Sequence, residues 1–264
     1  MFKKLFGGGA KTPAPSPRPA PRPTPRPTPR PHSSGEHPAT TALVNTIRAQ
    51  SATDPHIGAK IGAREVLQRL LEGLSQGPER RVHAESLLTA LGALAGYACQ
   101  MSIRAQSLRK GAPEFSAFIT MEAGGQRYFF GDPPNQLLLE SEHSVWSLAA
   151  AQAQSLGLDP LPKASEVAGH VASTIGTPAF GIPRLPEGHR PGERPIDYVR
   201  NLWPALFPTV KLLCPEPTYW PLLYAIAAQQ AMEMAKATMT ADLLYALVME
   251  AAAPMAKVDL DRHP

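Results

Sequence analysis

Residues 80–110 have the sequence RRVHAESLLTALGALAGYACQMSIRAQSLRK, which predicts one long helix of about 45 Å at a rise of ~1.5 Å per residue. Apolar residues recur along this stretch at steps of three and four, the spacing of one helix face. They are Leu87, Leu91, Leu94, Ala98, Met101, Ala105 and Leu108. We therefore expect this face to lie in the core of the protein.

The opposite face of the same helix carries mostly small residues. They are Thr89, Gly92, Ala93, Gly96 and Gln100. Small side chains let the backbone of a second helix approach closely. Each of the two interior glycines costs about 1 kcal/mol relative to alanine, so a close neighbour is expected to compensate. A helix with contact surfaces on both sides is predicted to lie at the centre of a helical bundle.

Composition and charge divide the chain into two parts. Its 264 residues, 43% of them apolar, suffice for one sizeable domain or two small ones plus a tail. Residues 1–35 contain seven Lys or Arg and no acidic residue, which leaves 19 basic against 22 acidic residues in the remainder. The two cysteines, Cys99 and Cys214, do not make a disulfide framework and favour a reducing, cytoplasmic compartment; a single disulfide between them is the alternative.

Residues 1–39 are predicted to be a disordered, basic, proline-rich tail or spacer. Proline occupies every odd position from Pro13 to Pro31, which favours polyproline II at ~3.1 Å per residue. No two of these prolines are three apart, so the PxxP motif of SH3 ligands is absent from the tract. Four arginines recur every four residues, whereas polyproline II turns every three, so their charges spiral around the axis. The tract is therefore either a semi-rigid spacer or a weak binding element for nucleic acid or anionic lipid.

Residues 40–264 are predicted to form a mainly α-helical domain around the long central helix. Helical spacing also appears near 41–50, 58–74, 146–157 and 165–175, and again from Pro221 with a break at 238–240. The helix at 58–74 is expected to form an antiparallel hairpin with the central helix. The uncharged span 86–103 has the length of a short membrane helix, but its polar residues argue against a transmembrane segment.

One small β-hairpin is predicted at 115–130, where the spacing changes from helical to alternating around Gly124-Gly125. A two-residue turn places Glu122 opposite Arg127, and opposite charges across such a pair stabilise it. The same register pairs Ile119 with Phe130 and Met121 with Tyr128. Because an isolated hairpin is marginally stable, this four-residue face is expected to pack on the helices.

Residues 177–220 contain prolines too often for a long regular element, and we predict an ordered proline-rich loop there. Its aromatic and aliphatic residues are expected to hold it against the domain. Its most polar part, residues 181–200, has the sequence GIPRLPEGHRPGERPIDYVR. The prolines restrict the backbone and so reduce the entropy that binding would cost.

This loop is the candidate partner or ligand site. Guanidinium groups suit carboxylates and phosphates, and the aromatic side chains offer an apolar wall. The candidate residues are Arg184, His189, Arg190, Arg194, Tyr198, Arg200 and Trp203. The competing interpretation is that its basic and acidic residues pair with one another while Trp203 anchors the loop to the core.

No catalytic motif is recognised in the sequence. His83-Ala84-Glu85 matches the HxE half of a zinc deaminase site, but the accompanying PCxxC is missing. GxSxG and Rossmann glycine patterns are also absent, so no cofactor or metal is predicted. The leading hypothesis is a non-enzymatic protein-interaction or adaptor module. The alternatives are an enzyme of unrecognised class with a site near residues 181–203, and polyanion binding through the tail.

Overall fold

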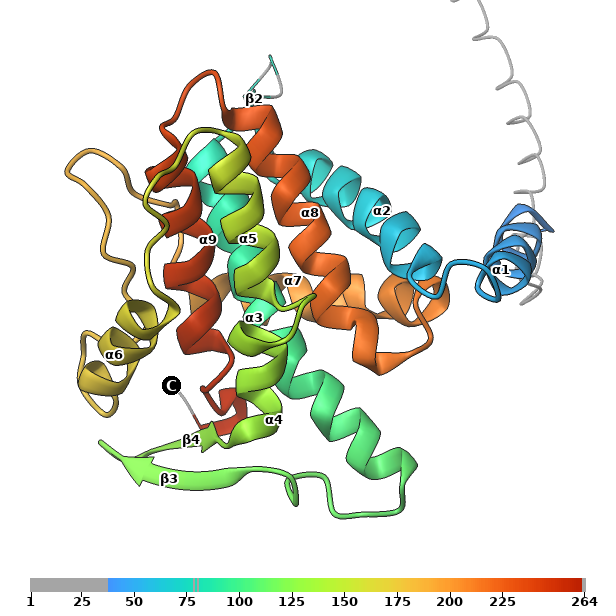
Figure 1. Cartoon of the computed structure of the whole chain (residues 1–264), viewed down its shortest axis with the longest axis horizontal. Coiled ribbons are helices and arrows are strands. Elements are labelled where there is room, and N and C mark those ends of the chain that lie inside the picture. The colour runs from blue at the N-terminus through green and yellow to red at the C-terminus, as the bar shows by residue number, and fades with distance from the viewer. Residues whose placement is uncertain (1–37, 78, 80, 263–264) are drawn as a thin grey trace, which may run out of the picture. The chain divides into compact units, whose positions relative to one another are not determined.

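The protein is mainly α-helical, as predicted (Figure 1). The computed structural model describes residues 38–77, 79 and 81–262. Residues 1–37 of the predicted tail lie outside the described residues. The longer helices are α1 (Pro38–Gln50), α2 (Ile57–Gly73), α3 (Ala84–Arg109), α5 (Val145–Ser155), α6 (Ala164–Thr174), α7 (Pro195–Leu213), α8 (Trp220–Ala235) and α9 (Ala241–Met255). The short elements are the strand pairs β1 (Ser75–Gln76) with β2 (Arg81–Val82) and β3 (Ile119–Ala123) with β4 (Gln126–Phe130), helix α4 (Asp132–Asn135), the π-helix η1 (Gln136–Glu140), and the 3-10 helices η2 (Pro217–Tyr219) and η3 (Leu260–Arg262).

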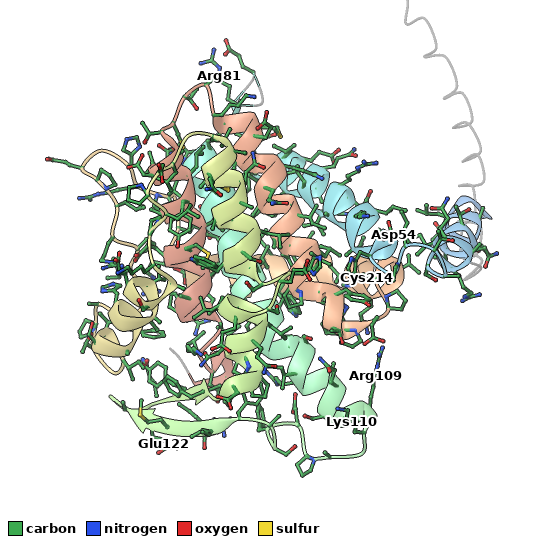
Figure 2. The ribbon with its side chains drawn as sticks, in the orientation of Figure 1. Asp54, Arg81, Arg109, Lys110, Glu122 and Cys214 are labelled. Atoms are coloured by element: carbon green, nitrogen blue, oxygen red, sulfur yellow. The ribbon has the colours of Figure 1, made fainter. Side chains whose placement is uncertain are left out.

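Helix α3 is the central element that the sequence predicts. It is buried without interruption from Ser86 to Gln100 and packs mainly on α9, α8 and α7 (Figure 1). It begins at Ala84 because the preceding residues Arg81 and Val82 pair with β1. Arg109 and Lys110 close it at the surface, where Arg109 donates to Glu216 (Figure 2).

The close neighbour predicted for the small-residue face of α3 is α9. A Cβ atom at Gly92 would overlap the carbonyl of Val248, and one at Gly96 would overlap the carbonyl of Ala252. One turn further on, Gln100 lies on the same face and its amide donates to the carbonyl of Met255 at 2.8 Å. The two helices therefore meet backbone to backbone, which the missing side chains make possible.

Helix α2 does not form the expected hairpin with α3. Its principal partners are α8 and α7, and Leu223 of α8 lies directly against Gly62 (Figure 1). The expectation was wrong because α7, α8 and α9 cover α3 and so leave α2 in an outer position. The short β1–β2 pair carries the chain from α2 back to the start of α3.

The hairpin has the predicted register, with Glu122 opposite Arg127 and Met121 opposite Tyr128. Its predicted burial is wrong for β3, where Ile119 is 68% and Met121 is 41% exposed. Strand β4 is buried instead, because its other edge pairs with residues 257–259: Phe129 N–H donates to the Lys257 carbonyl at 2.7 Å. β4 thus lies between two partners, and β3 is an outer strand.

The proline-rich stretch contains a long helix, contrary to the prediction for residues 177–220. Helix α7 begins at Pro195, where a proline is tolerated, and it includes Pro204 and Pro208. Both interior prolines lie on the exposed side, so the carbonyls at 200 and 204 that lose a helical donor can bond to water. The buried side offers apolar contacts through Trp203, Leu206 and Val210. These contacts stabilise a helix that proline content alone argues against.

Among the described residues, α3 is the one helix long and apolar enough to cross a membrane by length and composition. Inside the domain, 94% of its most apolar window is buried.

Candidate functional site

The candidate loop runs between α6 and α7 and passes beside α9 (Figure 1). Its first part contacts α9 through Arg184, and its second part contacts the start of α3 through His189. Two of the seven predicted site residues thus tie the loop to the bundle.

Arg184 holds the loop on a buried carboxylate. Glu250 of α9 is 8% exposed, and it accepts hydrogen bonds from the Arg184 backbone N–H at 3.3 Å and from Nε at 3.0 Å. His170 of α6 lies 4.0 Å from the same carboxylate. The hydrogen bond to Glu250 raises the pKa of Arg184 above its usual value. Arg184 therefore neutralises a buried acid, and this ion pair holds its exposed side chain in place.

His189 reaches a polar cluster at the start of α3. Its Nδ1 lies 3.1 Å from Glu85 Oε1, and His83 Nε2 lies 3.1 Å from the other carboxylate oxygen. Ser86 Oγ lies 2.8 Å from His83 Nδ1 and accepts from the backbone N–H of Gly192 at 2.9 Å. Burial acts to raise the pKa of Glu85, but hydrogen bonds from its own N–H and from His189 outweigh this and lower it.

Tyr198 and Trp203 are buried in the body of the domain and do not form an exposed wall. The Tyr198 hydroxyl accepts from the backbone N–H of Glu193 at 3.2 Å. Trp203 packs edge to face on Tyr97 and stacks on Phe207, with ring centroids 4.9 Å apart in each pair. Arg200 is half-buried on α7. Trp203 thus anchors α7 to the core, in line with the competing interpretation.

The loop itself encloses a groove of about 830 Å³. His189, Arg190 and Arg194 line it, whereas Arg184, Tyr198, Arg200 and Trp203 are not part of its lining. Its acidic and apolar lining includes Glu187, Glu193, Asp197 and Ile182. The structure therefore brings three of the seven predicted residues together in the groove. Arg184, Tyr198 and Trp203 instead hold the loop and α7 against the rest of the domain.

The charges of the groove are partly paired. Arg194 donates to Asp197 at 2.8 Å across one helical turn, and Glu193 accepts from Asn201. Arg190 and Glu187 are exposed, and neither makes an ion pair or side-chain hydrogen bond to another residue in the described part of the chain. Within the described part of the chain, the groove therefore presents an unpaired cation, Arg190, and an unpaired anion, Glu187, together with the exposed side chain of Ile182.

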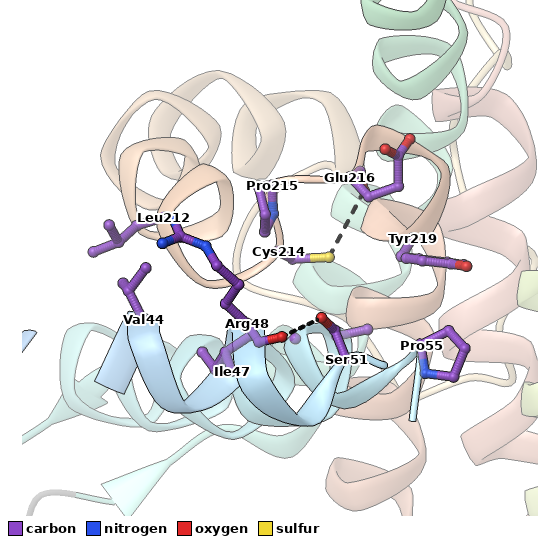
Figure 3. Close-up of a pocket in the computed structure, with 12 residues that line it drawn as sticks. Val44, Ile47, Arg48, Ser51, Pro55, Leu212, Cys214, Pro215, Glu216 and Tyr219 are labelled. Carbon is purple, nitrogen blue, oxygen red and sulfur yellow. Dashed lines mark hydrogen bonds between the residues drawn. The ribbon is translucent and has the colours of Figure 1, made fainter. Parts of the chain in front are cut away.

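A second hollow, of about 300 Å³, lies between α1 and the end of α7 (Figure 3). Its lining is largely apolar and includes Val44, Ile47 and Cys214. Burial raises the pKa of the Cys214 thiol to about 12, so the thiol stays protonated and unreactive at neutral pH. Cys99 is buried in α3 with a similarly raised pKa, and both cysteines are free.

No group of three His, Cys, Asp or Glu residues within 38–77, 79 and 81–262 can hold a metal ion. In the half-motif seen in the sequence, Glu85 contacts His83 and also His189.

Sequence reasoning missed Glu250 and the Glu85–Ser86 pair, on which the loop depends. Glu250 carried a signal, because it is the single charged residue of the run LLYALVMEAAAPMA, residues 243–256. A carboxylate inside such a run must be paired when the helix is buried. Nothing in the sequence indicates that the partner is Arg184, 66 residues away.

No family model matches the chain, and neither the curated proteins nor the solved structures contain a match to it.

Proposed function

We propose that the helical domain is a non-enzymatic interaction module that binds a protein partner at the groove of residues 182–197. The observation that carries this proposal is Arg190, an exposed guanidinium without a partner among the described residues, at the centre of a loop whose other basic groups are engaged. Arginine is enriched among the residues that contribute most to protein interfaces.

The loop is held in place before any partner arrives. Arg184 binds Glu250, His189 binds Glu85, and Gly192 binds Ser86. Prolines 183, 186 and 191 restrict the backbone between these contacts. A loop with few conformations loses little entropy on binding, so more of the contact energy appears as affinity.

The chemistry of the groove favours a protein surface over a polyanion. Arg190 offers a planar fork that matches a carboxylate, while Glu187 would repel a continuous run of phosphates. Ile182 adds an apolar contact at the rim of the groove. The expected partner surface therefore carries an Asp or Glu for Arg190, a basic group for Glu187 and an apolar patch between them.

The double substitution Arg190→Ala with Arg194→Ala is expected to weaken partner binding without destabilising the domain. Arg190 has no partner among the described residues and Arg194 makes an exposed pair, so the free energy of unfolding should change by less than about 1 kcal/mol. The full chain, immobilised, would be used to capture and identify the partner, and affinity would be measured by calorimetry. We expect a loss of at least tenfold.

Arg64→Ala with Arg69→Ala is the charge-matched control, because both arginines are exposed on α2. This variant should bind the partner like the wild type. If the Arg190/Arg194 variant binds the partner as tightly as the wild type does, the groove is not part of the interface. A large fall in the melting temperature of this variant would show that the two arginines stabilise the fold.

The polar cluster favours an enzyme as the second candidate. Ser86 Oγ lies 2.8 Å from His83 Nδ1, and His83 Nε2 lies 3.1 Å from the Glu85 carboxylate. This is the order of a nucleophile, a base and an orienting acid. Ser86 is buried, however, and its hydroxyl accepts from Gly192, so the loop covers the nucleophile. Covalent labelling of Ser86 by a fluorophosphonate would establish the hydrolase, and an unlabelled Ser86 would support the interaction module.

Polyanion binding through the tail remains a separate candidate, carried by the seven basic residues of positions 1–35. If this candidate is correct, the full chain is retained on heparin in a salt-dependent way, and deletion of residues 1–35 removes that retention.

A further inference from the structure

A buried lysine lies at the junction of the hairpin and α9. Lys257 is 7% exposed, and its backbone carbonyl accepts from Phe129 of β4. Its ammonium donates to Asn135 Oδ1 at 2.6 Å and lies 5.5 Å from the centre of the Phe130 ring. An ammonium has three N–H donors, and within the described residues the other two have no acceptor.

Such an environment is unfavourable for a charge. A buried ammonium needs hydrogen-bond acceptors or a counterion to replace the water that it loses. Burial lowers the pKa of Lys257, while Cys99 of α3 and Glu140 at the end of η1 act in the opposite direction. Glu140 is exposed, and among the described residues the hydrogen-bond partner of the ammonium is the neutral Asn135, so its charge is incompletely compensated.

The lysine lines a cavity of about 170 Å³. Asn135 supplies the second polar group, and the remaining lining is apolar, with Phe130, Leu138, Val171 and Ala253 from four different elements. This volume is well below the roughly 300 to 1,000 Å³ of pockets for drug-sized ligands. The cavity therefore suits a molecule of a few heavy atoms with one polar end.

The backbone around this cavity is unusual. Asn135 is followed directly by the π-helix η1, which carries the lining residues Leu138 and Leu139. π-helical turns are rare and occur frequently at functional sites. This observation is independent of the charge of Lys257 and marks the same place in the fold.

We propose that this cavity is a binding site for a small carboxylate with a short apolar chain. The carboxylate accepts hydrogen bonds from the two unused N–H groups of Lys257 and from the amide nitrogen of Asn135, whose oxygen already accepts from the lysine. The chain of the ligand contacts Leu138 and Val171. None of these residues lines the interaction groove, so the site is distinct from the proposed partner surface.

The test is calorimetric titration of the full chain with butyrate and, as the neutral analogue, with butyramide. We expect saturable binding of butyrate and binding of butyramide at least tenfold weaker. The Lys257→Met variant should lose butyrate binding by at least tenfold, whereas Lys236→Met, which removes an exposed lysine at the end of α8, should bind like the wild type.

A second variant separates loss of binding from loss of folding. Val171→Phe fills the cavity from α6 and leaves the lysine unchanged, so it should also lose butyrate while its circular dichroism spectrum matches the wild type. The proposal fails if wild-type protein shows no saturable butyrate binding, if butyramide binds equally well, or if a folded Lys257→Met or Val171→Phe protein keeps the wild-type affinity.

Discussion

Gly96→Leu is expected to lower the free energy of unfolding by about 3 kcal/mol or more, because a side chain at this position meets backbone. A Cβ atom alone would overlap the carbonyl of Ala252, and α9 cannot move that carbonyl without shifting the whole helix. Rotation of the new side chain brings no relief, since the clash begins at its first atom. Urea unfolding followed by circular dichroism measures the effect.

Gly169→Ala is the matched control for this substitution. Gly169 also lies inside a helix, α6, but nothing lies within 4 Å of the position where its Cβ would be. Alanine should therefore stabilise the protein by up to about 1 kcal/mol through helix propensity. A Gly96→Leu protein as stable as the wild type would show that α3 and α9 do not meet through their backbones.

Asp259→Ala is the second substitution with a large expected effect, a loss of about 3 kcal/mol. The Asp259 side chain is fully buried and accepts from Arg127 Nε at 2.6 Å. Its removal takes away the acid with which Arg127 forms an ion pair beside the rings of Phe115 and Phe129. It also removes the acceptor for the backbone N–H of Asp261. The measurement is again the free energy of unfolding in urea.

A double-mutant cycle with Arg127→Ala separates the energy of the Arg127–Asp259 ion pair from the other effects of removing Asp259, such as the lost acceptor for Asp261. We expect the double variant to be less destabilised than the sum of the two single variants. The exposed pair of Glu65 and Arg69 on α2 provides the comparison, and Arg69→Ala should cost at most about 0.5 kcal/mol. Strictly additive effects at 127 and 259 would mean that the ion pair does not hold β4 to residues 257–259.

Local signals predicted the parts of the fold that depend on neighbouring residues. The Gly124-Gly125 turn predicted the hairpin register, in which Glu122 lies opposite Arg127. The spacing of leucines and glycines in α3 predicted both a buried helix and a backbone-to-backbone neighbour. Neither prediction requires knowledge of which helix packs where.

The remaining features depend on contacts between distant parts of the chain. Helix α7 forms despite Pro204 and Pro208 because its buried side finds α3 and α2. The burial of β4 depends on residues 257–259, which no local pattern connects with a hairpin near 120.

In the candidate loop, too, some features follow from neighbouring residues and others depend on contacts with distant parts of the chain. Its arginines and prolines marked it as a candidate, but the sequence does not distinguish Arg190, which has no partner among the described residues, from Arg184, whose partner Glu250 lies on α9. The fold shows which of the two guanidinium groups already holds the loop in place.

The position of β4 between two partners has a consequence for the order in which the protein is made. Arg127 leaves the ribosome 132 residues before Asp259, a delay of about 7 to 26 s at typical synthesis rates of roughly 5 to 20 residues per second. During that interval residues 119–130 lack the segment that pairs with β4 in the folded domain, so Tyr128 and Phe129 cannot yet reach their full burial. We therefore expect the β4 side of the domain to close only after residues 257–259 have emerged.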